Sequence, residues 1–290
     1  MKTRKPLSIL LTLALVLGLL PWSVLPARAD APYDISRGPV IINSGNVSAW
    51  NGRTVTGSVN AIATAGAFST VTADNQRGAI IVDGVSVSLT IRDLSVVAAV
   101  SEGNLAKVSP ILLRNGARLD LTLEGANTLT ACSGGAGIRV PAGCLLTVDG
   151  SGSLNATGGD DGVSKHEQRG GGAGIGTDDT ASSNDNRVEN GTIVINGGTI
   201  TARGGSQTKT ISGVTLSLGS AGIGGSANTV GGSVTINGGA VTATGGGGAA
   251  GIGGGFEGSA AVTITGGAVT ATAGGGYSGG DMGAAIGCGY

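Results

Sequence analysis

The stretches Val234–Thr244 (VTINGGAVTAT) and Val262–Thr272 (VTITGGAVTAT) decide the fold of this chain. They differ at one position, and the second begins 28 residues after the first. In both, apolar residues alternate with hydroxyl residues, as in Val234-Thr235-Ile236, and alternation over so few residues is typical of strands rather than helices. Self-similarity at a spacing of a few tens of residues is typical of a solenoid. The sequence therefore predicts a solenoid built from short strands.

Copies of this unit also occur earlier in the chain. They are Ile193–Arg203, Leu146–Thr157 and Leu121–Ala131, with Leu89-Thr90-Ile91 opening a further one. Each copy is followed by a short block rich in Ala, Gly and Ile, and the isoleucines of these blocks are Ile138, Ile175, Ile223, Ile252 and Ile286. Asn-Gly-Gly and Gly-Gly separate the blocks, and both residue types tolerate the positive φ angles of tight corners.

Three short strands and three corners close one coil, so we expect an all-β parallel β-helix with three short strands per coil. We count six coils from Leu89 onward and expect two before it. Equivalent aliphatic side chains would stack into interior columns, and each buried one contributes roughly 1.5–3 kcal/mol before entropy costs. Such columns explain how a chain with 58 Gly and only 2% aromatic residues can still bury a core.

The first 29 residues have the features of a secretory signal peptide. Three basic residues lie between Lys2 and Lys5, an apolar run spans Leu7–Leu20, and Ala27-Arg28-Ala29 has the small-x-small pattern that signal peptidase reads. We expect cleavage after Ala29 and a secreted or cell-surface protein. An apolar run of about 14 residues is short for a bilayer span, and we expect no membrane span in the mature chain.

The sequence divides into three parts: residues 1–29 (signal peptide), 30–88 (N-terminal cap and first coils) and 89–290 (repeat β-helix). The chain stops at Cys288-Gly289-Tyr290, directly after a third-strand block, so we expect the natural protein to continue and the repeat region to be truncated at its C-terminus. Removal of the signal peptide takes four of the 17 basic residues and none of the 18 acidic ones, which leaves 13 basic residues and a net charge of −5. A mildly acidic surface argues against nucleic acid as a partner.

Three cysteines remain in the exported chain: Cys132, Cys144 and Cys288. An odd number in an exported protein is not a disulfide framework. Cys132 and Cys144 could bridge adjacent corners, or they could act as small apolar residues that fill interior positions.

The run from Leu112 onward resembles the large surface proteins of Gram-positive anaerobes that carry glycine-rich parallel β-helices. The resemblance lies in the motifs LEGANTLT, GGAGIRVPAGCLLTVDGSGSLNATGG and VTINGGAVTATGGGGAAGIGGG. Such proteins are described as carbohydrate-binding-like, and their fold is similar to that of polysaccharide lyases. The resemblance implies a right-handed helix and glycan binding or adhesion. It transfers no functional residue, because the shared motifs consist of core and corner positions.

The corners between second and third strands differ in length and define a candidate ligand site. Long segments occur at Asp160–Gly172, Ser206–Gly219 and Tyr277–Gly283, whereas the corner at Gly245–Gly248 is short and would leave a notch. Loops on a rigid scaffold are where binding groups collect. The candidate ligand-binding residues on this edge are Asp160, Asp161, His166, Glu167, Arg169, Lys209, Tyr277 and Asp281. The alternative is that these segments are solvated insertions without a ligand.

A second polar segment, Thr177–Asn190, lies at a different corner. Its candidate metal ligands are Asp178, Asp179, Asp185 and Glu189, whose hard oxygen atoms suit Ca²⁺. The spacing of known calcium loops is missing, so a flexible acidic loop is the alternative, and we expect no required cofactor.

An enzyme on this scaffold, either a polysaccharide lyase or a hydrolase, is the alternative function. Hydrolysis needs two carboxylates at a fixed separation, whereas the strands here present Thr, Ser and Asn outward, and Arg203 stands alone at its strand end. Flat arrays such as Thr242 and Thr244 above Thr270 and Thr272 also raise an ice-binding hypothesis, although Thr is simply a favourable exposed strand residue. We therefore expect a non-enzymatic, carbohydrate-binding adhesin or structural stalk whose partner is a polysaccharide or a host or cell-wall glycan.

Overall fold

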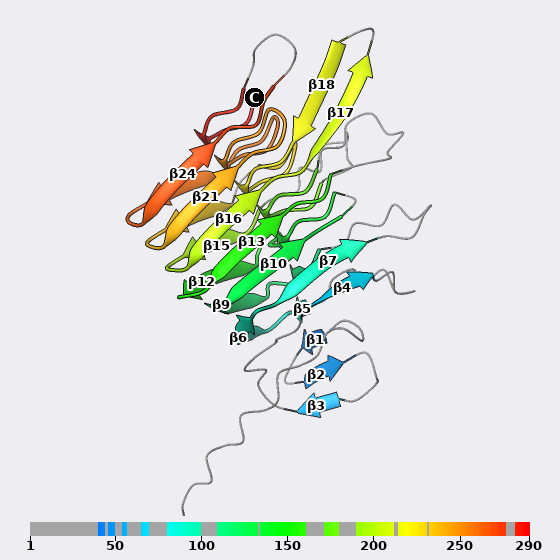
Figure 1. Ribbon diagram of the computed structural model, residues 1–290, viewed down its shortest axis with the longest axis vertical. Coiled ribbons are helices and arrows are strands. Elements are labelled where there is room, and N and C mark those ends of the chain that lie inside the picture. Colours follow the sequence, from blue (N-terminus) through cyan, green and yellow to red (C-terminus); the bar gives the residue numbers. More distant parts are fainter. Residues whose placement is uncertain are drawn as a thin grey trace, which may run out of the picture. The chain divides into compact units, whose positions relative to one another are not determined.

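The computed structural model shows a β-helix in the part of the chain that it describes (Figure 1). The described residues are 40–43, 46–49, 54–56, 65–69, 80–99, 109–132, 134–160, 171–179, 190–211, 214–230, 232–276 and 282–290. They all belong to one compact unit, Pro32–Tyr290. Every regular element among them is a strand, so the predicted all-β class is confirmed.

Three strands per coil recur along the chain, as predicted. The coil of β20 (Ser233–Ile236), β21 (Ala240–Thr244) and β22 (Ile252–Gly253) stacks on the coil of β23 (Ala261–Ile264), β24 (Ala268–Thr272) and β25 (Ile286–Gly287). All three pairs are parallel and in register. The two near-identical stretches of sequence therefore occupy equivalent positions in adjacent coils.

The stacked coils form three parallel sheets, which we name after the order of their strands within a coil. The first-strand sheet contains β6 (Ser86–Arg92), β9 (Arg118–Glu124), β12 (Leu145–Gly150), β15 (Thr192–Ile195), β20 and β23. The second-strand sheet contains β4 (Ala65–Ser69), β7 (Ser95–Ala99), β10 (Ala126–Thr130), β13 (Ser153–Thr157), β16 (Thr199–Arg203), β21 and β24. The third-strand sheet contains β1 (Val40–Asn43), β5 (Ile80–Asp83), β8 (Ile111–Arg114), β11 (Ile138–Arg139), β14 (Ile175–Gly176), β19 (Ile223–Gly224), β22 and β25.

Two short antiparallel segments depart from this pattern. At the N-terminal end, β2 (Asn46–Ala49) pairs antiparallel with β1, and β3 (Thr54–Thr56) pairs antiparallel with β2. Further along the chain, β17 (Ser206–Ile211) and β18 (Val214–Gly219) form an antiparallel hairpin. Within the described residues, all other strand pairs that join two coils are parallel.

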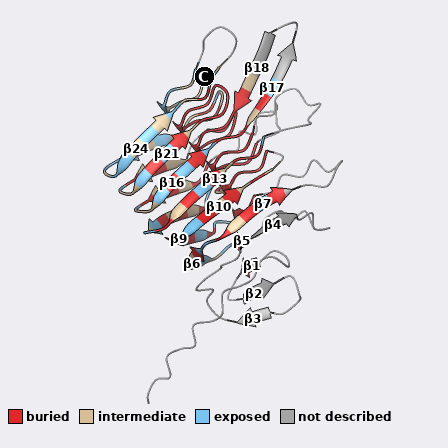
Figure 2. Cartoon of the chain, in the orientation of Figure 1, coloured by how far each residue is buried: buried red, intermediate tan, exposed pale blue. Residues whose placement is uncertain are grey.

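The core consists of aligned aliphatic columns. Figure 2 shows that buried residues recur along the stacked strands. The predicted isoleucine column is confirmed: parallel pairing joins Ile138, Ile175, Ile223, Ile252 and Ile286 in that order. Ile80 and Ile111 extend it by two coils. All members are fully buried except Ile286 in the last described coil, which is 44% exposed. Each buried isoleucine is thus covered by its equivalents above and below.

The corners between first and second strands carry a ladder of polar side chains. Asn237 Nδ2 donates to Asn196 Oδ1 of the preceding coil at 2.9 Å, and Thr265 Oγ1 donates to Asn237 Oδ1 at 2.7 Å. The positive φ of the corner falls on the second glycine, Gly239 (φ 83°), rather than on the asparagine. At this corner the asparagine side chain therefore provides the coil-to-coil hydrogen bond, and the second glycine provides the backbone conformation.

Candidate functional site

The corner between second and third strands is closed in the same way whatever its length. The backbone N–H of Gly172 donates to Gly159 O, that of Ser220 to Gly205 O, and that of Ala249 to Gly246 O, each at 3.0 Å. Each of these corners also bonds to the coil before it; for example, Gly205 N donates to Gly172 O at 2.8 Å. A segment of any length can therefore leave the coil at this edge without breaking the stack. Gly171 and Gly172, which we had assigned to the insertion, belong to the coil itself.

The insertion at Ser206–Gly219, which we expected to be a loop, is a hairpin. Strands β17 and β18 pair antiparallel from Ser206↔Gly219 to Ile211↔Val214. The segment SQTKTI-SG-VTLSLG has the alternation and the short Gly-containing turn that are typical of a hairpin, so the signal was present in the sequence. Lys209 lies in β17 opposite Leu216, and its side chain is outside the described residues.

A cavity of about 270 Å³ lies where the short corner at Gly246–Ala249 follows the hairpin. Four successive coils, those of β13, β16, β21 and β24, and the hairpin contribute to its wall. Its side chains come from Thr157, Asp160, Arg203, Ser206 and Ser217, and its backbone surface comes from Gly158, Gly204, Gly245, Gly246, Gly247 and Gly275. Since the lining consists of hydroxyls, two charged groups and peptide backbone, the cavity suits a polar ligand and not an apolar one.

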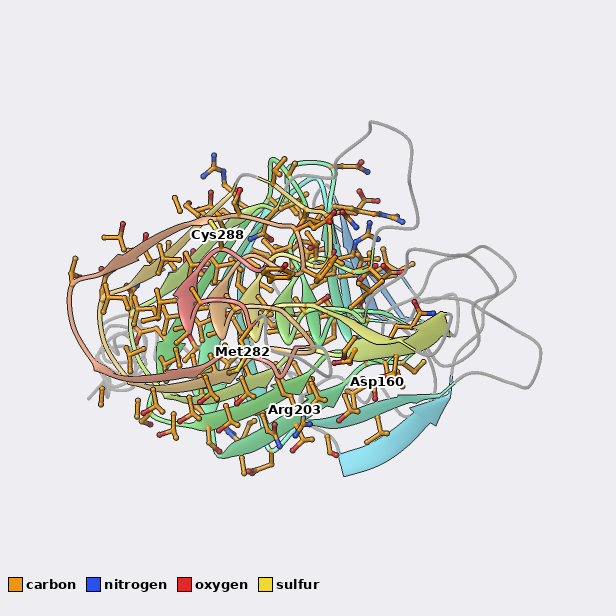
Figure 3. All side chains as sticks on the ribbon, turned by 90° about the horizontal axis from the view of Figure 1, so that it is seen from above. Asp160, Arg203, Met282 and Cys288 are labelled. Carbon is orange, nitrogen blue, oxygen red and sulfur yellow. The ribbon has the colours of Figure 1, made fainter. Side chains whose placement is uncertain are left out.

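Asp160 and Arg203 lie on the same side of the protein and both line this cavity (Figure 3). They come from adjacent coils: Thr157 pairs with Arg203 at the ends of β13 and β16, and Asp160 follows in the next corner. Asp160 Oδ1 accepts a hydrogen bond from Ser206 N at 2.8 Å, and Ser206 Oγ accepts one from Gly247 N at 2.9 Å. Arg203, which we expected to stand alone at its strand end, lines the same cavity as Asp160 and forms no ion pair with it.

Glycines allow the walls of the cavity to approach closely. A Cβ atom at Gly247 would lie 1.8 Å from Ser217 Oγ, and one at Gly246 would lie 2.1 Å from Gly205 O. The short corner must therefore be glycine for the hairpin to pack against it. Gly275 differs, because a Cβ atom there would meet no atom within 4 Å and its φ is not positive. This position opens onto free space at the cavity.

The remaining candidate ligand residues cannot be assigned to the cavity. Asp161, His166, Glu167, Arg169, Tyr277 and Asp281 lie outside the described residues. Of the eight candidates, Asp160 is the one whose side chain is described, and it lines the cavity. Arg203, Ser206, Ser217 and Thr157 were not among the candidates.

The acidic segment near Asp178 is partly integrated into the coil. Asp178 Oδ1 accepts hydrogen bonds from Ser109 Oγ (2.7 Å) and Ala136 N (2.8 Å), and its Oδ2 lies 3.2 Å from Arg139 Nε. Asp178 and Asp179 are buried rather than exposed in a loop, whereas Asp185 and Glu189 lie outside the described residues. Protein groups therefore already surround the Asp178 carboxylate.

Other potential reactive groups are dispersed. No disulfide joins Cys132, Cys144 or Cys288, and burial raises the pKa of the buried Cys144 thiol. Within the described ranges, no three His, Cys, Asp or Glu side chains come together in a way that could hold a metal ion. The same residues contain no helix of the length and apolarity that a membrane crossing requires.

Comparisons with models of protein families, with curated proteins and with solved structures found no match.

Proposed function

We propose that this chain is an exported surface protein in which the β-helix serves as a rigid stalk and the cavity at Asp160 and Arg203 binds carbohydrate. The cavity is the single observation that carries the proposal. Hydroxyl, carboxylate, guanidinium and backbone groups converge on it from four coils and the hairpin. Sugars present many hydroxyl groups, which can both donate and accept hydrogen bonds to such a lining.

The close packing of the scaffold also supports a binding role. The strands on either side of the cavity, β13, β16 and β21, belong to continuous parallel ladders. Their inward side chains, Leu154, Ile200 and Val241, are almost completely buried. Residues held by such a packed frame lose little conformational entropy when a ligand binds. The cavity lining among the described residues contains no aromatic side chain, so recognition would rest on hydrogen bonds and charge rather than on ring stacking.

A glycan-array screen of residues 30–290, carried out with calcium and with a chelator, tests this proposal. We expect binding to a restricted set of glycans. Binding that differs between calcium and chelator would indicate that a cation takes part in the site. A blank array from protein with an intact β spectrum in circular dichroism would overturn the binding role and leave that of a passive stalk. Sequencing the N-terminus of the secreted protein tests export, and we expect the mature chain to begin at Asp30.

The alternative, a polysaccharide lyase or hydrolase, is tested with the same glycans. Asp160 is the one carboxylate among the described residues that line the cavity, whereas hydrolysis of a glycosidic bond needs two. We expect neither new reducing ends nor new double bonds when the protein is incubated with the glycans it binds. Turnover of a bound glycan would replace the adhesin proposal with an enzymatic one.

A further inference from the structure

Arg203 differs from most of the other arginines that the structure describes. Arg92 pairs with Glu124, Arg114 with Asp83 at 2.6 Å, and Arg139 with Asp178 at 3.2 Å. Arg203 and Arg118 have no ion pair or side-chain hydrogen bond within the described residues. Of these two cations, Arg203 lines the cavity, whereas Arg118 is exposed at the start of β9. An unpaired guanidinium therefore lies at the site where the ligand is proposed to bind.

The neighbouring carboxylate does not neutralise this guanidinium. Asp160 shares the cavity with Arg203, but the two side chains form no ion pair. Asp160 Oδ1 instead accepts the hydrogen bond from Ser206 N and so fixes the base of the hairpin. The five N–H donors of Arg203 remain available, and their planar arrangement matches two oxygen atoms of one anionic group.

The strand surface that carries Arg203 has no acidic side chain among the described residues. In the second-strand sheet, the outward residue of each coil next to the cavity is aligned by the parallel register; these residues are Thr130, Thr157, Arg203, Thr244 and Thr272. None of the strands β10, β13, β16, β21 and β24 contains Asp or Glu. A row of hydroxyls with one positive charge therefore borders the cavity along these strands, and Asp160 is the one acidic side chain among the described residues that line it.

We propose that the glycan bound here is negatively charged and that an oxyanion of it, a sugar carboxylate or a sulfate, pairs with Arg203; this inference rests on the proposed function. The hydroxyl side chains of Thr157, Ser206 and Ser217 and the second carboxylate oxygen of Asp160 then face the uncharged part of the sugar. Arg203 is the residue that selects the charge of the ligand.

Binding of three polymers to residues 30–290 tests the proposal: polygalacturonate (carboxylate), dextran sulfate (sulfate) and dextran (neutral). We expect at least one polyanion to bind more tightly than dextran, with an affinity that falls as salt is added. Arg203→Gln should weaken that binding about tenfold or more, because charge-assisted hydrogen bonds are lost. Arg203→Lys should restore part of it, and Asp160→Asn should strengthen it by removing a like charge. The matched control, Arg118→Gln, should leave the affinity unchanged.

The outcomes separate the two proposals. Binding of neutral glycans with no effect of Arg203→Gln would overturn the charge inference while the glycan-binding function stands. Equal losses of affinity in Arg203→Gln and Arg118→Gln would also overturn it, because they would show that the overall charge of the protein, and not a site at Arg203, attracts the polyanion. Failure of the folded protein to bind any glycan, charged or neutral, would overturn both. The relative affinities for polygalacturonate and dextran sulfate identify which oxyanion the site prefers.

Discussion

The isoleucine column allows one prediction to be developed in detail, because it repeats the same residue in different surroundings. Ile223 is fully buried and lies between Ile175 and Ile252, whereas Ile286 occupies the equivalent position in the last described coil and is 44% exposed. Truncation of Ile223 to Ala removes buried methyl groups and leaves a cavity between two coils. Buried truncations of this kind cost about 2–5 kcal/mol. Ile286→Ala removes atoms that are already partly hydrated and opens no enclosed cavity, so we expect a loss of about 1 kcal/mol or less.

The assay is urea unfolding of residues 30–290 and the two variants, followed by far-ultraviolet circular dichroism. We expect Ile223→Ala to shift the unfolding midpoint several times further than Ile286→Ala. In a solenoid, a residue in an interior coil packs in two coil interfaces, whereas a residue in the last described coil packs in one. This difference also makes the loss of stability larger for Ile223→Ala than for Ile286→Ala. Equal losses in the two variants would refute the reasoning, because they would show that position in the stack does not determine how well the column is packed.

Three further predictions follow from the corners and the surface. Gly205→Ala should destabilise the protein strongly, because its Cβ atom would lie 2.3 Å from a backbone carbonyl oxygen of the adjacent coil. Gly275→Ala is the control, because a Cβ atom at Gly275 meets open space. Similar melting temperatures for the two variants would contradict the corner geometry. Deletion of residues 161–170 should leave the β spectrum unchanged, because hydrogen bonds close the coil at the base of this segment, and loss of folding in that variant would show that the segment is part of the coil. The hydrogen bond from Arg114 lowers the pKa of Asp83. The ionised Asp83 carboxylate therefore stabilises the fold at a pH above its ordinary pKa, and this stabilisation is lost as the pH falls through the lowered pKa. The melting temperature of Asp83→Asn should drop less between neutral pH and about pH 3 than that of the unmodified protein, and an equal drop would count against the Asp83–Arg114 pair.

The sequence predicted the coil well because every repeat obeys the same local rules. Alternation defined the strands, the Asn-Gly-Gly corner marked their ends, and Ile138 to Ile286 fell into one column, as the register confirms. Ile80 and Ile111 escaped notice because their strands read IIVD and ILLR rather than Ala-Gly-Ile. A coil can therefore depart from the consensus motif and still keep its inward aliphatic residue, so that it packs like the others although its sequence no longer resembles theirs.

The site was harder to predict because it depends on the register between coils. Asp160 follows β13 and Arg203 ends β16, so only the pairing of Thr157 with Arg203 brings their coils together. Polar residues in the insertions attracted attention by composition alone, and Asp178 and Asp179 were among them, yet both are buried in the coil. Composition therefore pointed to the edge of the coil that carries the cavity, while the cavity itself required knowledge of which residues align.

The measurement that tests the central claim most directly is the affinity of the best glycan from the array for the Gly275→Trp variant. Gly275 lines the cavity, has no positive φ and faces open space, so a bulky side chain can occupy the cavity without disturbing the coil. Gly275→Ala serves as the matched control, and thermal melting checks that both variants are folded. We predict that Gly275→Trp abolishes binding at an unchanged melting temperature, whereas Gly275→Ala retains it. Unchanged affinity in a folded Gly275→Trp variant would contradict the account, because the glycan would then bind elsewhere on the protein.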